Sequence, residues 1–502
     1  MKLRNLKWSF LAMGMLAMVS CSEEYLDTEF LGAVNEEDFY SNETEAYSGL
    51  VSVYDLLRKQ SGGFENMIAM LNAGSDDFFA GGGSPSDGAG IQSFSNYTIN
   101  SATVPRSFWS DYYQGVYRAN LLLTKIPDVP MSDATKARFT AETKALRGYY
   151  YFQLVTLFRD VPLITQPVPA AEYYNILQAP PAEVYAQIEA DLTAAIPDLP
   201  MTLDPATEAG RLNKGAAQAI LGKVYLYQHK DAQAAAMFAE VNGTPGGANQ
   251  YGYSLLPNYA DLWNIDNKFN SESIFEASHT KESNAGWGNW GSGSDEGNSL
   301  NIMVGPRGYV SLNPTAPQYV AGWSFNTVTL DLVEEMQDDP RFDATILDMN
   351  ALVQAGAANY TPANADTGYF LKKFMPTNAD LTDGGGDQVL NFRQNTYIIR
   401  LADTYLLEAE ALGGTGARAQ ALLDAVRARV GLPSVPVSMQ AIWDERRLEL
   451  AGEGHRWMDL VRTGRAATVL APRGFQANKN EYFPIPLREL ENTKIVQNPA
   501  YN

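Results

Sequence analysis

The sequence predicts a mostly α-helical fold with long irregular loops and little β-structure. Apolar residues recur at intervals of three and four residues in several separate segments, which is the spacing of one face of an α-helix. Two long stretches between these segments lack that spacing and are rich in Gly, Asn, Ser, Pro and aromatic residues. With 502 residues, 45% of them hydrophobic, the chain is long enough to bury a large core.

The N-terminus has the pattern of an export signal. Three basic residues come first: Lys2, Arg4 and Lys7. The apolar run that follows, residues 8–19, has the length of a signal peptide and is too short to span a bilayer. It ends just before Cys21, the only cysteine, so the chain has no intramolecular disulfide. The pattern resembles a bacterial lipoprotein signal, and we expect cleavage of residues 1–20 and lipid attachment at Cys21. The alternative is an ordinary secretory signal followed by an incidental cysteine.

Residues 21–34 are expected to form a lipid-anchored tether. Glu23 and Glu24 keep this segment solvated, and acidic residues at this place resemble the signal that sends Bacteroidetes-type lipoproteins to the outer face of the cell. A plain acidic linker is the alternative. No other apolar run approaches the roughly 20 residues of a membrane span, so the acyl chain is the only membrane attachment we expect.

The charge of the chain argues against nucleic acid as a partner. The formal net charge is −21 and the isoelectric point about 4.6. Removal of residues 1–20 takes away three positive charges, so the mature chain carries about −24 (−21 − 3). Such a chain repels nucleic-acid phosphates and anionic membrane surfaces, whereas neutral ligands, cationic ligands and protein partners stay open.

Amphipathic helices are predicted in order along the first 200 residues. The segments are 45–60, 108–126, 140–158 and 181–200. In the first of them Tyr47, Leu50, Tyr54 and Leu57 lie on one helical face. Pro162 follows the third segment and cannot continue a helix.

Two further segments predict pairs of helices joined by a short turn. In 211–243, small residues allow close packing and a polar break at residues 229–231 separates two alanine-rich helices. In 397–432, three glycines at 413, 414 and 416 form the turn. Units of this kind resemble tetratricopeptide repeats. We therefore expect tetratricopeptide-like helix pairs that form a superhelical scaffold.

The loop-rich stretches are residues 72–100 and 245–395. Loops this long are usually functional or disordered, and their aromatic content argues against disorder. We expect an N-terminal helical region over 35–244 and a C-terminal region over 245–502. The latter comprises the loop-rich part and closing helices over 396–502, and both regions belong to one compact body.

Aromatic residues in the second loop are the candidate binding residues. Trp287 and Trp290 stand among glycines, and Tyr309 and Trp323 follow within the same span. A sugar ring has an apolar C–H face that stacks on an aromatic ring and a rim of hydroxyl groups that bind amides and carboxylates. The rim candidates are Asn289, Asp295, Asn298 and Asn301. The alternative is that the rings pack the loop onto the scaffold.

Several catalytic and metal-binding chemistries lack their motifs. The three histidines, His229, His279 and His455, are far apart and form no H-E-x-x-H, and no G-x-S-x-G occurs. The glycines of 413–423 follow a helix and lack the Lys-Ser/Thr pair of a phosphate loop. We expect no catalytic residue, no metal and no cofactor.

The segment "DERRLELAGEGHRWMDLVRTG" (444–464) is dense in charges of both signs. Glu445, Glu449 and Glu453 are four residues apart, on one helical face. Buried charges must be paired. We interpret the segment as a structural ion-pair network rather than a ligand site.

Several strings in this order resemble the SusD/RagB family of Bacteroidetes outer-membrane lipoproteins. Besides the signal they are "ALRGYYYFQLVTLFRDVPLI" (145–164), "RLNKGAAQAILGKVYLYQ" (211–228), "GWSFNTVTLDLVEEMQDDPRFDATI" (322–346), "IIRLADTYLLEAEAL" (398–412), "DERRLELAGEGHRWMDLVRTGRA" (444–466) and "YFPIPLRELENTKIVQNPAYN" (482–502). The resemblance covers essentially the whole chain.

The resemblance implies a fold and a role. It implies four tetratricopeptide-like helix pairs under long ligand-binding loops, and a binding protein rather than an enzyme. Such proteins cover a SusC-like TonB-dependent transporter and capture a nutrient, commonly an oligosaccharide. The loop at 72–100 then contributes to the ligand face, which makes Asp77, Phe78 and Phe79 candidates. Calcium binding by Asp76 and Asp77 lacks a D-x-D-x-D-G pattern.

Other functions stay open at this point. The same architecture can capture peptides or another nutrient. A secreted glycoside hydrolase, which needs a pair of carboxylates across one bond, is a second alternative. A pure scaffold leaves the glycine-flanked tryptophans unexplained.

Overall fold

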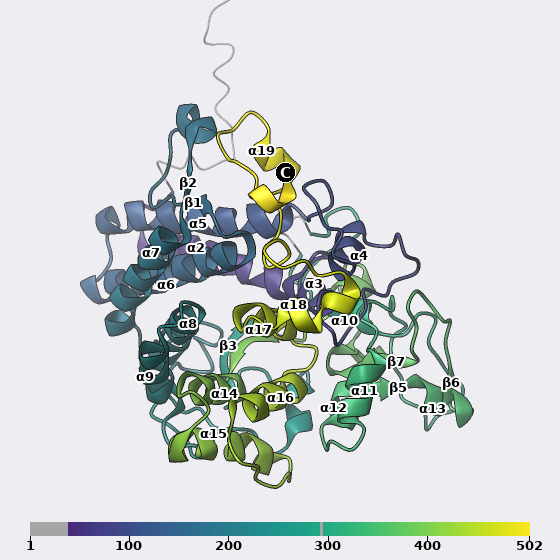
Figure 1. The fold of residues 1–502 in the computed structure, drawn as a ribbon. Coiled ribbons are helices and arrows are strands. Elements are labelled where there is room, and N and C mark those ends of the chain that lie inside the picture. The colour runs from purple at the N-terminus through teal and green to yellow at the C-terminus, as the bar shows by residue number, and fades with distance from the viewer. Residues whose placement is uncertain (1–38, 292–294) are drawn as a thin grey trace, which may run out of the picture.

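The computed structural model describes residues 39–291 and 295–502 (Figure 1). The signal peptide, Cys21 and the tether over residues 21–34 lie outside the described residues. Within the described ranges, no helix is long and apolar enough to cross a membrane.

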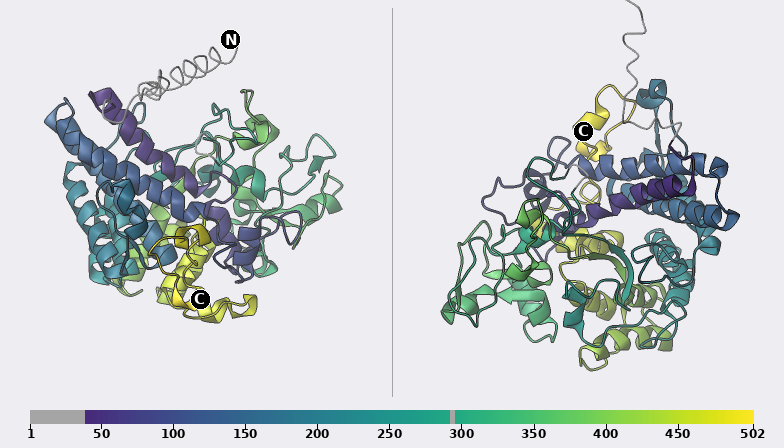
Figure 2. Two further views of the ribbon diagram at one scale, coloured as in Figure 1. Left: turned by 90° about the horizontal axis from the view of Figure 1, so that it is seen from above. Right: turned by 180° about the vertical axis from the view of Figure 1, so that it is seen from behind.

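Long helices in antiparallel pairs make up the scaffold. They are α2 (Glu43–Tyr54), α5 (Ser107–Lys125), α6 (Asp133–Phe158), α7 (Pro181–Ala195), α8 (Lys214–Tyr227), α9 (Asp231–Asn242), α14 (Leu401–Ala411), α15 (Gly416–Arg429) and α16 (Met439–Glu449). Helix α6 packs on α5 and α7, α8 packs on α9, and α14 packs on both α9 and α15. Figures 1 and 2 show this succession as a curved stack around one side of the molecule. The predicted mostly helical fold is confirmed.

The pair α8–α9 illustrates how the sequence builds one unit. The side chain of Asn213 accepts a hydrogen bond from the Ala216 amide at 2.8 Å and so caps the start of α8. A Cβ on Gly222 would lie 2.7 Å from the ring of Phe238 in α9. The predicted close approach of the two helices therefore depends on this glycine.

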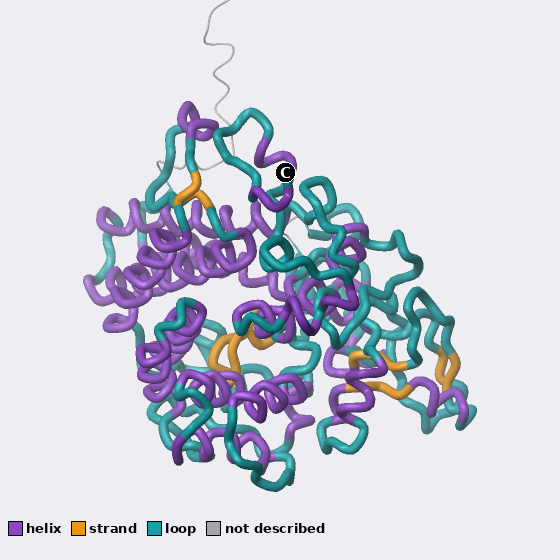
Figure 3. Tube along the Cα trace, viewed as in Figure 1, coloured by secondary structure: helices purple, strands orange, loops and turns teal. Residues whose placement is uncertain are grey.

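Part of the segment predicted as a helix pair, 397–432, forms a strand instead. Strand β8 (Thr396–Arg400) pairs antiparallel with β3 (Ser273–Ala277), and α14 begins only at Leu401. The five residues TYIIR are all buried, and β-branched and aromatic residues suit a strand that is covered on both faces. Figure 3 shows this pair of strands in the middle of the molecule, between the helices.

Short elements lie in or beside the loop-rich stretches, between α6 and α7, and near the C-terminus. The helices are α3 (Met67–Ala73), α4 (Ala89–Ser95), α10 (Leu300–Val304), α11 (Leu330–Met336), α12 (Phe342–Thr345), α13 (Met349–Gln354), α17 (Arg456–Arg462), α18 (Ala466–Val469) and α19 (Leu487–Leu490). The strand pairs are β1 (Val161–Pro162) with β2 (Gln178–Ala179), β4 (Val310–Ser311) with β6 (Ala358–Asn359), and β5 (Ile346–Asp348) with β7 (Tyr369–Leu371). Helices α11 to α13 and strands β5 to β7 gather at one side of the scaffold (Figure 1).

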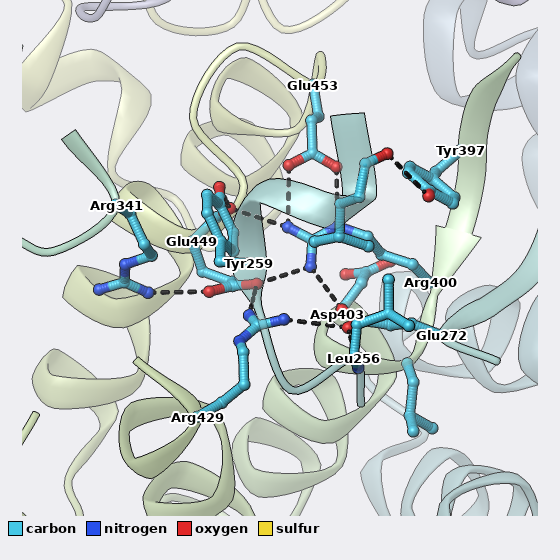
Figure 4. A network of polar contacts seen from close by, with 12 residues as sticks. Leu256, Tyr259, Glu272, Arg341, Tyr397, Arg400, Asp403, Arg429, Glu449 and Glu453 are labelled. Carbon is cyan, nitrogen blue, oxygen red and sulfur yellow. Dashed lines mark hydrogen bonds and ion pairs between the residues drawn. The ribbon is translucent and has the colours of Figure 1, made fainter. Parts of the chain in front are cut away.

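A buried ion-pair network joins the loop-rich region to the helices (Figure 4). Arg400 of β8 contacts Glu272 at 2.9 Å, Glu449 at 2.6 Å and Glu453 at 2.8 Å. Arg341 and Arg429 complete the network, Arg341 at 2.9 Å from Glu449 and Arg429 at 2.9 Å from Glu272. Burial alone would raise the pKa of Glu449, but the three guanidinium groups outweigh it and hold that pKa well below its usual range.

The predicted structural role of the charged segment 444–464 is therefore confirmed. Its glutamates are buried and paired, but Arg341, Arg400 and Arg429 come from outside the segment. The helical face expected for Glu445, Glu449 and Glu453 holds only for the first two, because α16 ends at Glu449 and Glu453 lies in the turn that follows. Spacing along the chain gave no information about the distant arginines.

Candidate functional site

Trp287, Trp290 and Trp323 lie together in one aromatic cluster. The ring centroid of Trp290 lies 5.7 Å from that of Trp287 and 5.6 Å from that of Trp323, and both pairs are nearly perpendicular. Trp287 and Trp323 lie 5.9 Å apart with an interplanar angle of 32°. Edge-to-face contacts at these distances are favourable, so the three rings hold one another in place.

The cluster is open to water on one side. Trp287 is 58% exposed, whereas Trp290 and Trp323 are half-buried. Below them Phe64 contacts Trp290, with 5.9 Å between centroids, and Phe325, with 5.1 Å. Phe325 is buried in the core. The tryptophans thus form the exposed end of an aromatic stack that begins in the core.

Hydrogen bonds fix the loop that carries Trp287 and Trp290. The backbone amide of Trp287 donates to the Asp387 carboxylate at 3.1 Å, and the Gly286 amide donates to the Asn289 side chain at 2.7 Å. The indole N–H of Trp290 donates to the Ser299 hydroxyl at 2.8 Å. These bonds hold the backbone at Trp287 and the indole ring of Trp290 in defined positions.

Gly297 sets the path of the same loop. A Cβ at this position would lie 2.0 Å from the carbonyl oxygen of Leu390, a distance that a real Cβ cannot adopt. The neighbouring Asn298 amide donates to the Phe392 carbonyl at 2.8 Å. The loop therefore runs directly against the segment 390–392 because residue 297 has no side chain.

Trp323 is held by two other segments. Its amide donates to the Ile302 carbonyl in α10 at 2.9 Å. On its other side the strand-like segment 324–328 pairs with residues 78–82, through the bridges Phe78–Val328 and Gly81–Phe325. The predicted loop 72–100 thus supports the aromatic cluster.

A charged pair borders the cluster beside Trp323. Arg307 donates to the Trp323 carbonyl at 3.2 Å and lies 3.5 Å from the Asp87 carboxylate. Asp87 also accepts a hydrogen bond from the Gly83 amide at 2.7 Å. Both side chains are more than one third exposed, so they can offer hydrogen bonds at the rim of the aromatic surface.

The three residues predicted on loop 72–100 lie away from this surface. Asp77 is fully buried and forms a 2.8 Å ion pair with Arg447, while its neighbour Asp76 pairs with Arg456 at 2.7 Å. Burial and the adjacent Asp76 raise the pKa of Asp77 to about 6. Phe78 is buried in the core, and Phe79 is half-buried. The guanidinium of Arg473 lies over the Phe79 ring at 5.2 Å.

The structure therefore changes the role expected for that loop. Asp77 and Phe78 have no exposed surface for a ligand, because their neighbours bury them in forming the pairing with 324–328. The part of the loop that reaches the cluster is its tip, where Asp87 meets Arg307 and Gly88 lies against Phe64.

Tyr309 and the rim candidates have other environments. Tyr309 is buried, donates its hydroxyl to the Pro317 carbonyl at 2.6 Å and stacks edge-on with Tyr319. Asn298 and Asn301 are buried, and their side-chain amides donate to backbone carbonyls. Asp295 is buried too, where it accepts from the Gly291 amide. Of the rim candidates Asn289, half-buried beside Trp287, stays at the cluster.

The described residues hold neither a metal-binding cluster nor an accessible serine–histidine pair. Within residues 39–291 and 295–502, no group of three His, Cys, Asp or Glu side chains is placed to hold a metal ion. His279 and Ser61 form a 2.7 Å contact, but both are buried and the Ser61 hydroxyl also meets Thr396 at 2.8 Å. A substrate has no access to that serine.

Comparisons with known proteins identify the family. A family model described as the SusD family matches residues 271–501, and one described as "Starch-binding associating with outer membrane" matches residues 42–226. A solved structure of a laminarin-binding SusD-like protein is 64% identical, covers 92% of this chain and 100% of its own, and superposes with a TM-score of 0.91. The chain belongs to the SusD/RagB family.

Other SusD-like proteins agree with this assignment. A surface glycan-binding protein A from Bacteroides thetaiotaomicron, solved in complex with laminarihexaose, is 26% identical and has a TM-score of 0.81, with 91% of this chain and 99% of its own covered. A curated SusD-like protein of Formosa agariphila is 26% identical over 96% of both chains. The family resemblance seen in the sequence strings is thereby confirmed.

Sequence reasoning missed Phe64, Asp87 and Arg307 in this SusD-family chain. Phe64 follows Gly62 and Gly63, the same glycine–aromatic signal that singled out Trp287. Asp87 lies in "GGGSPSDG", within the loop 72–100 that the family resemblance places at the ligand face. Arg307 carries no comparable signal, because its place beside Trp323 arises only from folding.

Proposed function

We propose that this protein is a cell-surface glycan-binding lipoprotein. It captures an oligosaccharide or polysaccharide of the laminarin type and delivers it to a SusC-like TonB-dependent transporter in the outer membrane. The exposed cluster of Trp287, Trp290 and Trp323 is the observation that carries the binding part of this proposal. The protein acts as a binding protein without catalysis.

The chemistry of the cluster supports a sugar ligand. Indole faces that are fixed in advance stack on the C–H face of a pyranose, and Arg307, Asp87 and Asn289 provide polar groups at the edge. The 64% identical relative is a laminarin-binding protein, and a more distant one was solved with laminarihexaose. Both point to the same class of ligand.

Family membership and the export signal support delivery at the membrane. One matching family model is described as associating with the outer membrane. A lipid on Cys21 would hold the chain there, facing the exterior, and a partner barrel would provide the pore. The first step to test is sugar binding, because delivery depends on it.

The test measures binding of laminarihexaose and laminarin by calorimetry to the chain that lacks residues 1–21. Wild type should bind, and Trp287→Ala should lower the affinity by roughly 30-fold or more, as removal of a central aromatic contact does at binding hot spots. Tyr174→Ala is the matched control, because Tyr174 is an exposed aromatic residue, at 61%, in a short 3-10 helix (Ala170–Asn175) outside the cluster.

Three outcomes separate the possibilities. If Trp287→Ala and Tyr174→Ala lower the affinity equally, the binding site does not lie at this cluster. Binding of a peptide library but of no sugar would favour capture of a different nutrient. Release of shortened sugars from laminarin by the purified protein would contradict the absence of catalysis.

A further inference from the structure

A polar pocket opens next to the tryptophan cluster. It has a volume of about 280 Å³ and lies between Trp290, Phe64 and the start of α5. This is slightly below the ~300–1,000 Å³ of typical small-molecule sites, so it has room for one sugar unit rather than for a chain.

Trp290 and Phe64 belong both to the pocket and to the aromatic cluster. The two rings meet edge-to-face at 5.9 Å, and each lines the pocket. Trp290 is fixed by its hydrogen bond to Ser299 and is nearly perpendicular to Trp287 and Trp323. A glycan that stacks on the exposed indoles therefore has the pocket directly beside it.

Hydrogen-bonding groups line the inner end of the pocket. The ammonium group of Lys59 donates to the Ser107 hydroxyl at 2.6 Å, and Ser107 donates to the Glu65 carboxylate at 2.9 Å. Lys59 also lies 3.5 Å from the Asp111 carboxylate. These groups include both donors and acceptors, which is the combination that vicinal hydroxyl groups require.

The charges around the pocket are balanced. Arg58 and Lys59 contribute two positive charges, and Glu65 and Asp111 contribute two negative charges. Burial lowers the pKa of Lys59, while Asp111 and Glu65 oppose that shift. A ligand group with its own charge would disturb this balance at the cost of desolvation, whereas a neutral sugar would not.

We propose that this pocket is a second subsite, which binds one neutral sugar unit of the glycan beyond the units that stack on the tryptophans. The inference rests on the proposed glycan binding. Glu65 is its specificity-determining residue, because its carboxylate is half-buried at the pocket and accepts hydroxyl hydrogen bonds. The pocket then makes affinity depend on the length of the oligosaccharide.

The test measures calorimetric affinity for the series from laminaribiose to laminarihexaose. Wild type should gain about tenfold in affinity at the length that first places a unit in the pocket, the effect of one or two charge-assisted hydrogen bonds. Glu65→Gln should remove most of that step and leave the affinity for shorter oligosaccharides unchanged. Trp287→Ala should weaken binding at every length that binds.

Glu183→Gln is the matched control, because Glu183 is an exposed glutamate on α7. Thermal unfolding by circular dichroism checks that each variant folds. If Glu65→Gln and Glu183→Gln give the same affinity at every length, the subsite is wrong while the tryptophan site stands. If wild type binds no member of the series, the proposed laminarin-type function fails, and the subsite fails with it.

Discussion

At the scale of single residues, Gly297 and Gly288 occupy the same loop under opposite constraints. A Cβ at Gly297 would collide with the Leu390 carbonyl, whereas a Cβ at Gly288 meets nothing within 4 Å. Only the first glycine is needed for packing. Replacing each glycine by alanine therefore separates two effects. One is the loss of the close contact between residue 297 and Leu390, and the other is the replacement of a glycine anywhere in this loop.

Gly297→Ala should move the tryptophan loop away from the segment 390–392. We expect a loss of about 1–3 kcal/mol in the free energy of unfolding, the usual cost of an added group in a packed site. Affinity for laminarihexaose should fall as well, because the loop carries Trp287 and Trp290. Urea unfolding and calorimetry measure the two quantities.

Gly288→Ala provides the comparison for this experiment. It should leave the unfolding free energy within about 0.5 kcal/mol of wild type, as surface substitutions usually do. An equal loss in both variants would mean that general flexibility of the loop, rather than the contact with Leu390, determines its position.

The candidate site was predictable from sequence in part. Trp287, Trp290 and Trp323 were separate candidates for the binding surface, and the structure brings the three rings into contact. Asp77 was expected at the ligand face but is buried against Arg447, which is 370 positions away in the chain. Local composition identifies glycine-flanked aromatics, whereas an ion pair across such a distance is visible only in the folded chain.

At the scale of elements, the buried network around β8 fixes the loop-rich region to the scaffold. Arg400 lies in β8, Glu272 immediately precedes β3, and Glu449 ends α16. All three are fully or almost fully buried. Loss of one member leaves the opposite charges buried without compensation.

Arg400→Met should destabilise the protein strongly. Methionine fills similar space but leaves Glu272, Glu449 and Glu453 with less positive charge, and breaking a buried pair from one side costs about 3–5 kcal/mol. The free energy of unfolding in urea measures this loss.

Arg393→Met is the control for the network. Arg393 pairs with the exposed Asp266 at 2.5 Å near the surface. Its removal should have a much smaller effect, because water screens such pairs. If Arg400→Met and Arg393→Met lose similar amounts of unfolding free energy, the buried network stabilises the protein no more than a surface ion pair does.

Strand β8 is an element that the sequence pattern predicted wrongly. Residues 397–400 were assigned to a helix because they continue an apolar pattern into α14. A short apolar run has no period of its own that distinguishes a buried strand from a buried helix. Pairing with β3, more than 100 residues earlier, decided the outcome.

At the scale of the whole molecule, His279 links segments from both halves of the chain. Its Nδ1 lies 3.1 Å from the Glu296 carbonyl, and its Nε2 lies 2.7 Å from the Ser61 hydroxyl. Because a carbonyl only accepts, Nδ1 carries the proton and Nε2 accepts from Ser61. Burial lowers the pKa of His279 to about 4.

The titration of His279 should therefore lower the stability of the protein as the pH falls below 6.5. The unfolded chain takes up a proton on this histidine near pH 6.5, whereas the folded chain resists until about pH 4. At pH 4.5 this difference removes about 2–3 kcal/mol from the free energy of unfolding relative to pH 7.5. Asp77 has the opposite effect. Because its pKa is raised from 3.8 to about 6 in the folded chain, its protonation adds to the free energy of unfolding as the pH falls from about 6 towards 4.

Urea unfolding at pH 7.5 and pH 4.5 isolates the histidine's contribution. His279→Gln should reduce the loss of stability on acidification by about 2–3 kcal/mol, because glutamine does not titrate. His229→Asn, at an exposed turn with a φ of 56°, should leave the loss as it is in wild type. An unchanged loss in His279→Gln would contradict the lowered pKa.

The sequence by itself determined the helical scaffold, the two loop-rich stretches, the SusD/RagB family and the three tryptophans that stand at the surface. The scaffold, the loop-rich stretches and the glycine-flanked tryptophans depend on spacing and composition within short segments. The family rests instead on the resemblance of several strings along the chain to known members. The domain boundaries, the lipid on Cys21 and the transporter partner stay predictions.

The tertiary structure decided which polar residues are buried and which residues meet. It placed Asp77 among arginines, turned residues 397–400 into a strand and brought Phe64 under Trp290 beside a polar pocket. The reason is physical: burial and contact depend on segments hundreds of residues apart packing together, and no local pattern specifies that packing.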